Sequence, residues 1–323
     1  MQLNGIHHVT AVSARIGVNY DFYTRVLGLR LVKRSVNQDD VSAYHLFYAD
    51  KVGTPGTDMT FFDWAHIGQD RRGTDSISTT AFRVHGRAAL EYWSARLRDF
   101  KVSAIKNFAG RDLITFEDPE GQRLALVDDQ GAAYEGVVWD QTDVPAEFAL
   151  RGFYAVMLSS PQLEYLKPIL MQVLDFREQG QHANFYPDGG EVTIFAMGEG
   201  GAGREIWVAL EPNKSRAQMG AGGVHHLALR VANDEEQRYW RERITKVGLP
   251  VSEFIDRFYF KSIYFRVSMG ILFEIATDGP GFHADEDLAT LGERLALPPF
   301  LEPQRAQIEA NLKPIVPPAN PSL

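Results

Sequence analysis

The 323-residue sequence contains no cysteine. Without thiols the chain can form no disulfide, zinc–thiolate site, iron–sulfur cluster or cysteine nucleophile, so any protein ligand to a metal must be His, Asp or Glu. The sequence also lacks the run of about 18 apolar residues that a membrane-spanning helix needs. Its first residues show no basic segment followed by an apolar one, as a signal peptide has. These absences predict a cytoplasmic protein with no membrane partner.

An excess of positive charge is missing as well. The chain has 33 Lys and Arg residues and 42 Asp and Glu residues, which gives a formal net charge of −9. Non-specific binding to nucleic acid or to an anionic membrane rewards a positive surface, so neither partner is expected. The 45% hydrophobic and 23% charged residues are typical of a globular protein. This chain length predicts two domains, or one body built from repeated units.

A repeated tetrapeptide, Gly-x-His-His, opens two distant segments of the chain. It occurs at Gly5–His8 and again at Gly223–His226, each time inside a short β-prone run. A helical pattern follows each run and ends at a glycine, Gly28 or Gly248, where helices commonly stop. Two further copies of the same order of elements, without the histidines, lie between them.

The repeat predicts an α+β fold made of four βαβββ modules, because a recurring unit of this size defines an architecture better than any single element does. The expected modules span 3–65, 77–130, 149–211 and 222–278. They are expected to group into an N-terminal domain (1–135), a linker (136–148), a C-terminal domain (149–280) and a tail (281–323). The tail carries a helical pattern from Leu301 to Leu312 and a proline-rich end.

Three residues in this pattern suggest chemistry: His8, His226 and Glu274. Side chains alternate along a strand, so one histidine of each pair points into the curved face of the sheet. Glu274 lies in the apolar run Leu272–Ala276, and a carboxylate there is costly to bury unless it is paired or bound to a metal. Two imidazoles and one carboxylate on one face form the ligand set of non-haem Fe(II) oxygenases.

These segments resemble the ring-cleaving dioxygenases of the vicinal oxygen chelate superfamily, which also contains glyoxalases and bleomycin resistance proteins. The branch that opens hydroquinones is the most similar. The resemblance covers essentially the whole chain and rests on four motifs, at His7–Thr10, Val224–Ala228, Asp256–Phe260 and Phe273–Ala276. It implies two tandem vicinal oxygen chelate domains, a Fe(II) ion (with Mn(II) as the other choice), and extradiol-type cleavage of a small aromatic substrate with both atoms of O2. Degradation of aromatic compounds is the role that it suggests.

The resemblance also implies seven site residues. The metal ligands would be His8, His226 and Glu274. The catalytic residues would be His7 and Thr10 beside the metal, and Arg257 and Tyr264 against the aromatic ring. The ligands would come from the first and fourth modules, since the second and third carry Thr79, Ala125 and Phe153 at the corresponding positions.

Two other functions stay open at this stage. A glyoxalase-like isomerase or lyase would use a redox-inert metal and normally a fourth protein ligand, which Phe61–Phe62 at the end of the first module does not offer. A metal-free binding or resistance protein would have no need of Glu274 in an apolar strand. The sequence does not choose hydroquinone over catechol, name the ring substituents or separate iron from manganese. A homodimer is expected because this scaffold often pairs.

Overall fold

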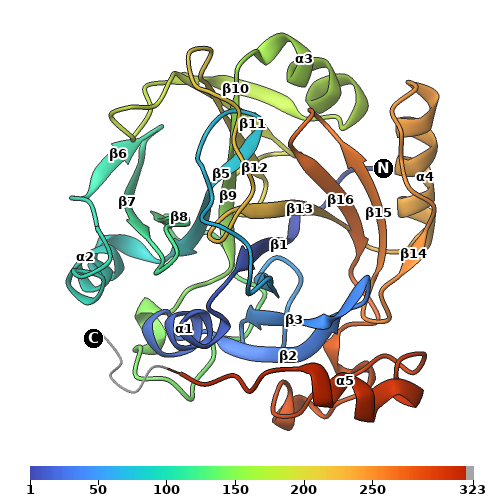
Figure 1. The fold of residues 1–323 in the computed structure, drawn as a ribbon. Coiled ribbons are helices and arrows are strands. Elements are labelled where there is room, and N and C mark those ends of the chain that lie inside the picture. The colour runs from blue at the N-terminus through green and yellow to red at the C-terminus, as the bar shows by residue number, and fades with distance from the viewer. Residues whose placement is uncertain (318–323) are drawn as a thin grey trace.

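The computed structural model describes residues 1–317, and these form four βαβββ modules in the predicted order (Figure 1). The first module contains β1 (Ile6–Ser13), α1 (Ile16–Asp21), β2 (Arg30–Asn37), β3 (Asp40–Ala49) and β4 (Asp58–Asp63). The second contains β5 (Ser76–Val84), α2 (Gly86–Arg96), β6 (Lys106–Phe108), β7 (Arg111–Glu117) and β8 (Arg123–Asp128). The third contains β9 (Phe153–Ser160), α3 (Leu163–Pro168), β10 (Arg177–His182), β11 (Val192–Ala196) and β12 (Glu205–Leu210). The fourth contains β13 (Val224–Val231), α4 (Asp234–Lys246), β14 (Ile255–Asp256), β15 (Lys261–Arg266) and β16 (Leu272–Thr277). The predicted α+β fold is confirmed.

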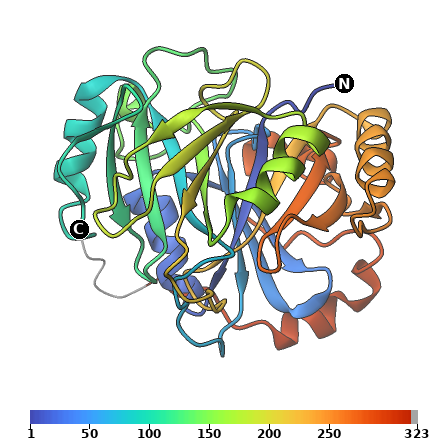
Figure 2. The same ribbon diagram turned by 90° about the horizontal axis from the view of Figure 1, so that it is seen from above.

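Two curled eight-stranded sheets lie side by side (Figure 2). One has the strand order β14-β15-β16-β13-β1-β4-β3-β2, so it joins the first and fourth modules; the other, β10-β11-β12-β9-β5-β8-β7-β6, joins the second and third. The central seams are the antiparallel pairs β1–β13 and β5–β9. Each sheet therefore takes one module from either side of segment 136–148, and the division into domains at that segment stays a prediction.

Alternating side chains give each sheet two apolar faces. In β8, Leu124 and Leu126 belong to the large core that also contains Trp93 of α2 and Trp240 of α4. The intervening Ala125 faces the concave side of the second sheet, in a separate apolar cluster. This period of two is the pattern expected of strands that are covered on both faces.

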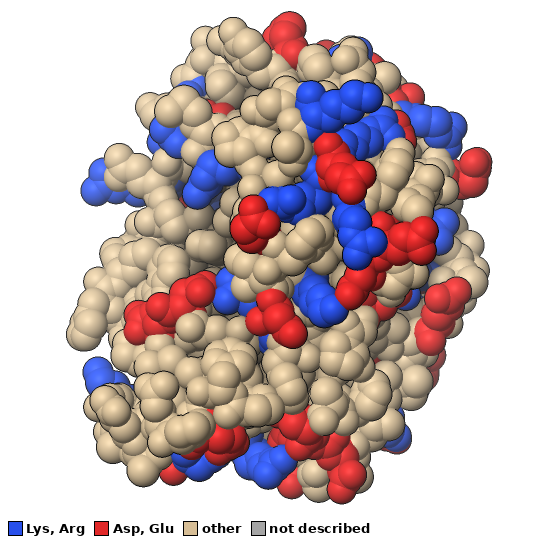
Figure 3. Space-filling model, turned by 90° about the vertical axis from the view of Figure 1, so that its right-hand side faces the viewer, with Lys and Arg blue, Asp and Glu red and all other residues tan. Residues whose placement is uncertain are grey.

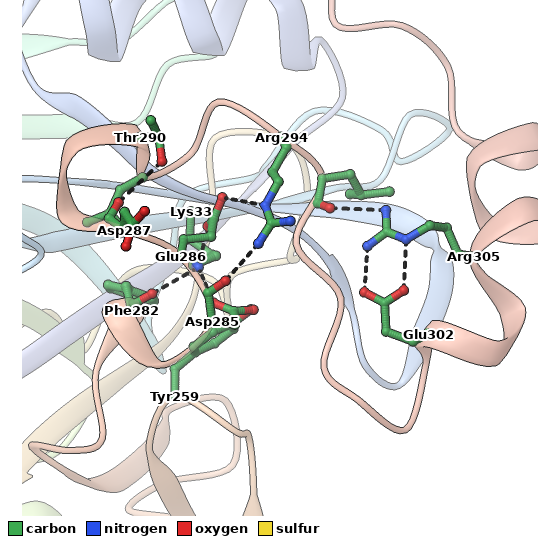
Figure 4. Close-up of polar contacts among 12 residues, drawn as sticks. Lys33, Tyr259, Phe282, Asp285, Glu286, Asp287, Thr290, Arg294, Glu302 and Arg305 are labelled. Atoms are coloured by element: carbon green, nitrogen blue, oxygen red, sulfur yellow. Dashed lines mark hydrogen bonds and ion pairs between the residues drawn. The ribbon is translucent and has the colours of Figure 1, made fainter.

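The tail packs beneath the first sheet, along β2 (Figure 1). Lys33 of β2 is fully buried there; its Nζ donates to the Phe282 carbonyl at 3.0 Å and to Asp285 at 2.7 Å, and it is paired with Glu286 (Figure 4). Tyr259, under the Lys33 ammonium at 4.6 Å, donates its hydroxyl to Asp285 at 2.9 Å. A chain segment outside the four modules thus supports the turn between β14 and β15.

The tail helix is shorter than its pattern suggested. Helix α5 spans Arg305–Asn311, preceded by a 3-10 turn at Glu302–Gln304. Pro303 in that turn has no backbone N–H to donate, which favours the first turn of a helix over its interior. Residues 318–323 of the proline-rich end lie outside the described residues.

The face that carries α4 and β14 displays basic and acidic side chains interleaved (Figure 3). Ion pairs such as Lys261–Asp234 at 2.5 Å and Arg241–Glu253 at 2.6 Å account for part of this mixing. Within residues 1–317, no helix is long and apolar enough to cross a membrane.

Candidate metal centre

His8, His226 and Glu274 meet on the concave face of the first sheet. His8 Nε2 lies 3.3 Å from His226 Nε2 and 3.3 Å from Glu274 Oε2, and His226 Nε2 lies 3.0 Å from the same carboxylate oxygen. All three side chains are buried. In the part of the chain that the structure describes, this is the one group of three such residues whose donor atoms lie close enough to share an ion.

Strand register explains why residues 266 positions apart in sequence come together. His8 of β1 lies opposite Ala228 of β13, and Ala228 lies opposite Glu274 of β16. The small side chain of Ala228 leaves space between the two larger ones. His226, two residues before Ala228, points to the same face one row further along. The centre is therefore built across the β1–β13 seam.

Each histidine turns Nε2 toward the centre and is held from behind through Nδ1. The Nδ1 atoms of His7 and His8 are 2.9 Å apart, and those of His225 and His226 are 2.8 Å apart. If Nε2 of His8 and His226 is unprotonated, as a ligand nitrogen must be, then their Nδ1–H groups donate to the preceding histidine. Such outer hydrogen bonds fix the ring orientation and tautomer of ligand histidines.

One oxygen of the Glu274 carboxylate is held by a hydrogen bond from a neighbouring strand, and the other is not. Its Oε1 accepts a hydrogen bond from Ser262 Oγ at 2.5 Å. Its Oε2 receives no hydrogen bond of acceptable geometry from the described residues, although it is fully buried beside two imidazoles. An unsatisfied buried carboxylate oxygen is costly, and it requires an explanation such as an ion.

The surroundings favour an ionised Glu274 and a neutral His226. Burial alone would raise the pKa of Glu274, but the nearby imidazoles of His8 and His226 outweigh it and hold the pKa well below its usual range. Burial lowers the pKa of His226 despite the carboxylate nearby. These are the protonation states that metal binding requires.

The donor set fits a divalent cation. Two ligands at about 2.1 Å from one ion, at right angles, lie about 3.0 Å apart. The observed separations of 3.0–3.3 Å among the three donor atoms match that spacing. Two nitrogen donors and one carboxylate suit Fe(II) and Mn(II), and they leave the remaining positions open.

His7 contacts the candidate ligand His8 and does not line the cavity at the centre. A register shift between Ile6 and His8 marks a bulge that brings both histidines to the same region. Nε2 of His7 is buried without a partner among the described residues, and burial together with His8 lowers the pKa of its imidazole to about 3. His7 is therefore neutral and supports His8.

Thr10 lies on the concave face but is already hydrogen-bonded. Its Oγ1 is 2.8 Å from Thr60 Oγ1, which in turn is 2.9 Å from His45 Nε2. Thr10 thus begins a three-residue polar chain across β1, β4 and β3. His45 reaches this place through the pairing of β3 with β4.

Arg257 and Tyr264 share one wall of the centre. Tyr264 lies opposite Glu274 in the β15–β16 register, and its ring stands perpendicular to the imidazole of His226 at 5.8 Å. The Arg257 guanidinium is 5.6 Å from the Tyr264 ring. Burial and Glu274 raise the pKa of the Tyr264 phenol, so it stays protonated and able to donate.

These groups open onto a cavity of about 40 Å³. Its lining combines His8, His226, Arg257 and Tyr264 with the aromatic Phe62 and Phe260, and with residues that the sequence did not indicate, among them Asp39, His45 and Phe47. Phe260 packs against His8 at 5.1 Å and Phe62 against His45 at 4.5 Å, measured between ring centroids. The centre is thus enclosed by aromatic side chains that limit access of water.

The second sheet has no such centre at the equivalent place. Thr79 and Ala125 fall at the positions of His226 and Glu274, as expected. The position of His8 is taken by Ala155 and not by Phe153. Ala155 and Ala125 both pair with Ala81, as His8 and Glu274 both pair with Ala228. The expectation for Phe153 was therefore wrong by two residues. Trp207, Phe108 and Phe185 fill this concave face, with ring centroids 4.9–5.8 Å apart, and the buried Glu205 nearby pairs with the half-buried Arg111 at 2.7 Å.

The chain is similar to proteins of one superfamily. Residues 5–126 match the family model described as the Glyoxalase/Bleomycin resistance protein/Dioxygenase superfamily. The chain is 46% identical to MhqA of Bacillus subtilis (strain 168), named as a ring-cleaving dioxygenase, over 98% of this chain and 100% of that protein. It is 30% identical to a chlorohydroquinone/hydroquinone 1,2-dioxygenase of Sphingobium indicum, over 93% of each chain. A crystal structure of a Bacillus subtilis protein named as a dioxygenase superposes with a TM-score of 0.88 at 38% identity, over 97% of each chain.

Proposed function

The chain belongs to the ring-cleaving dioxygenases of the glyoxalase/bleomycin resistance protein/dioxygenase superfamily, and on that premise we propose that it is an Fe(II)-dependent enzyme that opens a hydroquinone-type aromatic ring with O2. The observation that carries the proposal is the cluster of His8, His226 and Glu274, whose one unsatisfied oxygen and two inward nitrogens converge within 3.3 Å. A catechol-type ring is the other substrate class that this ligand set would serve.

Iron held by His8, His226 and Glu274 would supply the positions at which the substrate hydroxyl and O2 are brought together and activated. Both oxygen atoms would enter the product when the ring carbon–carbon bond beside a hydroxylated carbon is cleaved. The chain's own residues would keep the ligand geometry fixed: Ser262 holds Glu274 Oε1, and His7 holds His8 Nδ1.

The substrate ring would be oriented by protein groups. A hydroquinone places its second hydroxyl across the ring, so only one of its oxygens can reach the metal. Tyr264, kept protonated, and Arg257 would donate to oxygen on which negative charge develops, a role in which preorganised donors are most effective. Phe62 and Phe260 would hold the ring faces and exclude water.

Anaerobic loading with Fe(II), followed by oxygen-uptake measurements on a panel of hydroquinones and catechols, tests the proposal. We expect uptake of one O2 per ring, with two ¹⁸O atoms in the product when ¹⁸O2 is supplied. Protein loaded with Zn(II) in the same way serves as the control and is expected to consume no oxygen. Failure of the Fe(II) form to consume oxygen with any member of the panel would contradict the proposal.

A further inference from the structure

An ion pair crosses the mouth of the metal cavity. Arg257 donates from Nη1 to Asp39 Oδ1 at 3.2 Å and from Nη2 to Asp39 Oδ2 at 3.0 Å. Asp39 lies in the turn between β2 and β3, and Arg257 lies in the turn between β14 and β15. These strands form the two opposite edges of the curled sheet, so the pair joins the edges over the cavity. A second bond, from Gln38 Nε2 to the Arg257 carbonyl at 2.9 Å, joins the same two turns.

The pair also determines the charge that a substrate substituent meets. Arg257 is the one Lys or Arg side chain in the described lining of the cavity, and Asp39 is the one Asp or Glu. The rest of that lining is aromatic, aliphatic, amide, hydroxyl or imidazole. Because Nη1 and Nη2 each already donate to Asp39, the Arg257 guanidinium can give a substrate oxygen a further single bond but cannot bind a second carboxylate through two.

We propose that Asp39 sets the charge selectivity of the site: by occupying Arg257, it makes the enzyme select hydroquinones with uncharged substituents over those with a ring carboxylate. The inference rests on the proposed function. Asp39 is a positioning residue here, since it acts through Arg257 and not on the reacting atoms.

Competition for the guanidinium gives the selectivity. A planar guanidinium binds one carboxylate through two parallel hydrogen bonds, and a substrate carboxylate would have to displace Asp39 or lie beside its like charge. An uncharged methyl or chloro substituent needs no such displacement and packs against Phe47 or Phe62. The Asp39 side chain is 73% exposed, so water screens the pair and the expected discrimination is moderate, about tenfold.

Three variants isolate the effect. Asp39→Asn removes the charge but keeps the shape, and Asp39→Glu restores the charge. Asp40→Asn is the matched control, because the neighbouring Asp40 carboxylate bonds Ser42 and not Arg257. For each protein, oxygen uptake gives kcat/KM for 2,5-dihydroxybenzoate and for methylhydroquinone, and anaerobic calorimetry on the Fe(II)-loaded protein gives the two dissociation constants.

We expect Asp39→Asn to raise the preference for 2,5-dihydroxybenzoate over methylhydroquinone about tenfold, both as the ratio of the two kcat/KM values and as the ratio of the two binding affinities. Asp39→Glu should return both ratios toward the wild-type values. Asp40→Asn should leave the ratio unchanged. An unchanged ratio in Asp39→Asn, an equal rise in Asp40→Asn, or failure of every protein to bind either compound would overturn the inference. Binding ratios that shift as expected without any oxygen uptake would support charge selection and contradict the proposed function alone.

Discussion

Thr60 occupies in the first module the position that Glu274 occupies in the fourth. In each module the last strand pairs in parallel with the first strand. Thr60 on β4 lies opposite Thr10, which is two residues after His8. Glu274 on β16 lies opposite Ala228, which is two residues after His226. The sequence had suggested Phe61–Phe62 for this position, so that assignment is corrected by one residue. The hydroxyl of Thr60 is already hydrogen-bonded to Thr10 and His45 and is a weaker metal ligand than a carboxylate, so the first module offers no fourth candidate ligand at this position.

Replacing Thr60 by Glu should therefore convert an open centre into one with four protein ligands. We expect Thr60→Glu to retain metal but to lower oxygen uptake at least about tenfold, because a position needed by substrate or O2 is filled. Thr60→Val, which removes the hydroxyl without adding a ligand, is the control for the lost hydrogen bonds. Metal analysis, near-ultraviolet circular dichroism and oxygen uptake distinguish the outcomes; full activity with a Glu at position 60 would contradict the equivalence.

Loss of the Glu274 carboxylate should remove metal from the protein. Loss of Glu205, the buried carboxylate of the second sheet, should not. Glu274→Gln and His226→Ala are each expected to lower metal content and abolish turnover, since loss of an outer supporting residue alone typically reduces affinity or activity 10–100-fold. Glu205→Gln, which weakens the Arg111 pair, should lower stability and leave metal content intact. Elemental analysis after dialysis against a weak chelator is the measurement. Retained metal and activity in Glu274→Gln would exclude the three-residue centre.

Tyr264→Phe and Arg257→Ala should slow turnover more than they weaken metal binding. Each loses one hydrogen bond to the substrate, which corresponds to about 1.5–3 kcal/mol, or one to two orders of magnitude in rate. A hydroquinone depends on these groups for orientation, whereas a catechol can chelate through two oxygens. The loss should therefore be larger for hydroquinones than for catechols. Equal losses on both classes, or loss of iron together with activity, would indicate a structural role.

The stability of the protein should depend on Asp118 and on pH. Burial raises the pKa of this carboxyl from 3.8 to about 7, although Glu120 and Gln122 donate backbone N–H bonds to it. Its contribution to stability is therefore present below about pH 4 and is lost as the pH rises through about 7. Asp118→Asn keeps the acceptor oxygen and removes the titration, so it should stabilise more at pH 8 than at pH 5, by about 2 kcal/mol. Urea unfolding at both pH values measures this; an equal effect at both would contradict it.

Lys33 should be essential for the attachment of the tail. Lys33→Met removes the one cation that is buried with Asp285 and Glu286, and leaves two carboxylates with weaker partners. Breaking a buried pair by removing one member costs about 3–5 kcal/mol. Denaturant unfolding gives that loss, and limited proteolysis should show earlier cleavage after Phe282 than in wild type. Arg305→Met, which breaks the exposed pairs with Glu302 and Glu309 and one bond to the Leu295 carbonyl, is the control and should lower stability much less.

The sequence was most informative where a pattern repeats. The doubled Gly-x-His-His and the isolated Glu274 indicated the modules and the three clustered residues, because both follow from strand alternation, a local property. It did not indicate His45 or Asp39, since their positions depend on how β3 pairs with β4 and how two sheet edges meet. Bulges add residues that an aligned repeat does not show, such as the shift between Ile77 and Thr79. The π-helical turns that end the first and third helices, at 22–26 and 169–173, likewise leave no signal in the apolar period.

The order of the sheets along the chain has a consequence for biosynthesis. The second sheet is complete once residue 210 has been made, because its two modules lie between the first and fourth modules in the sequence. The central seam of the first sheet cannot form before β13 has been made. Until β13 has left the ribosome, one edge of β1 is unpaired, and His8 lies near neither His226 nor Glu274. The aromatic-filled half can thus fold first and serve as a partner for the nascent first module, while His8, His226 and Glu274 can meet only after residue 274 has been made.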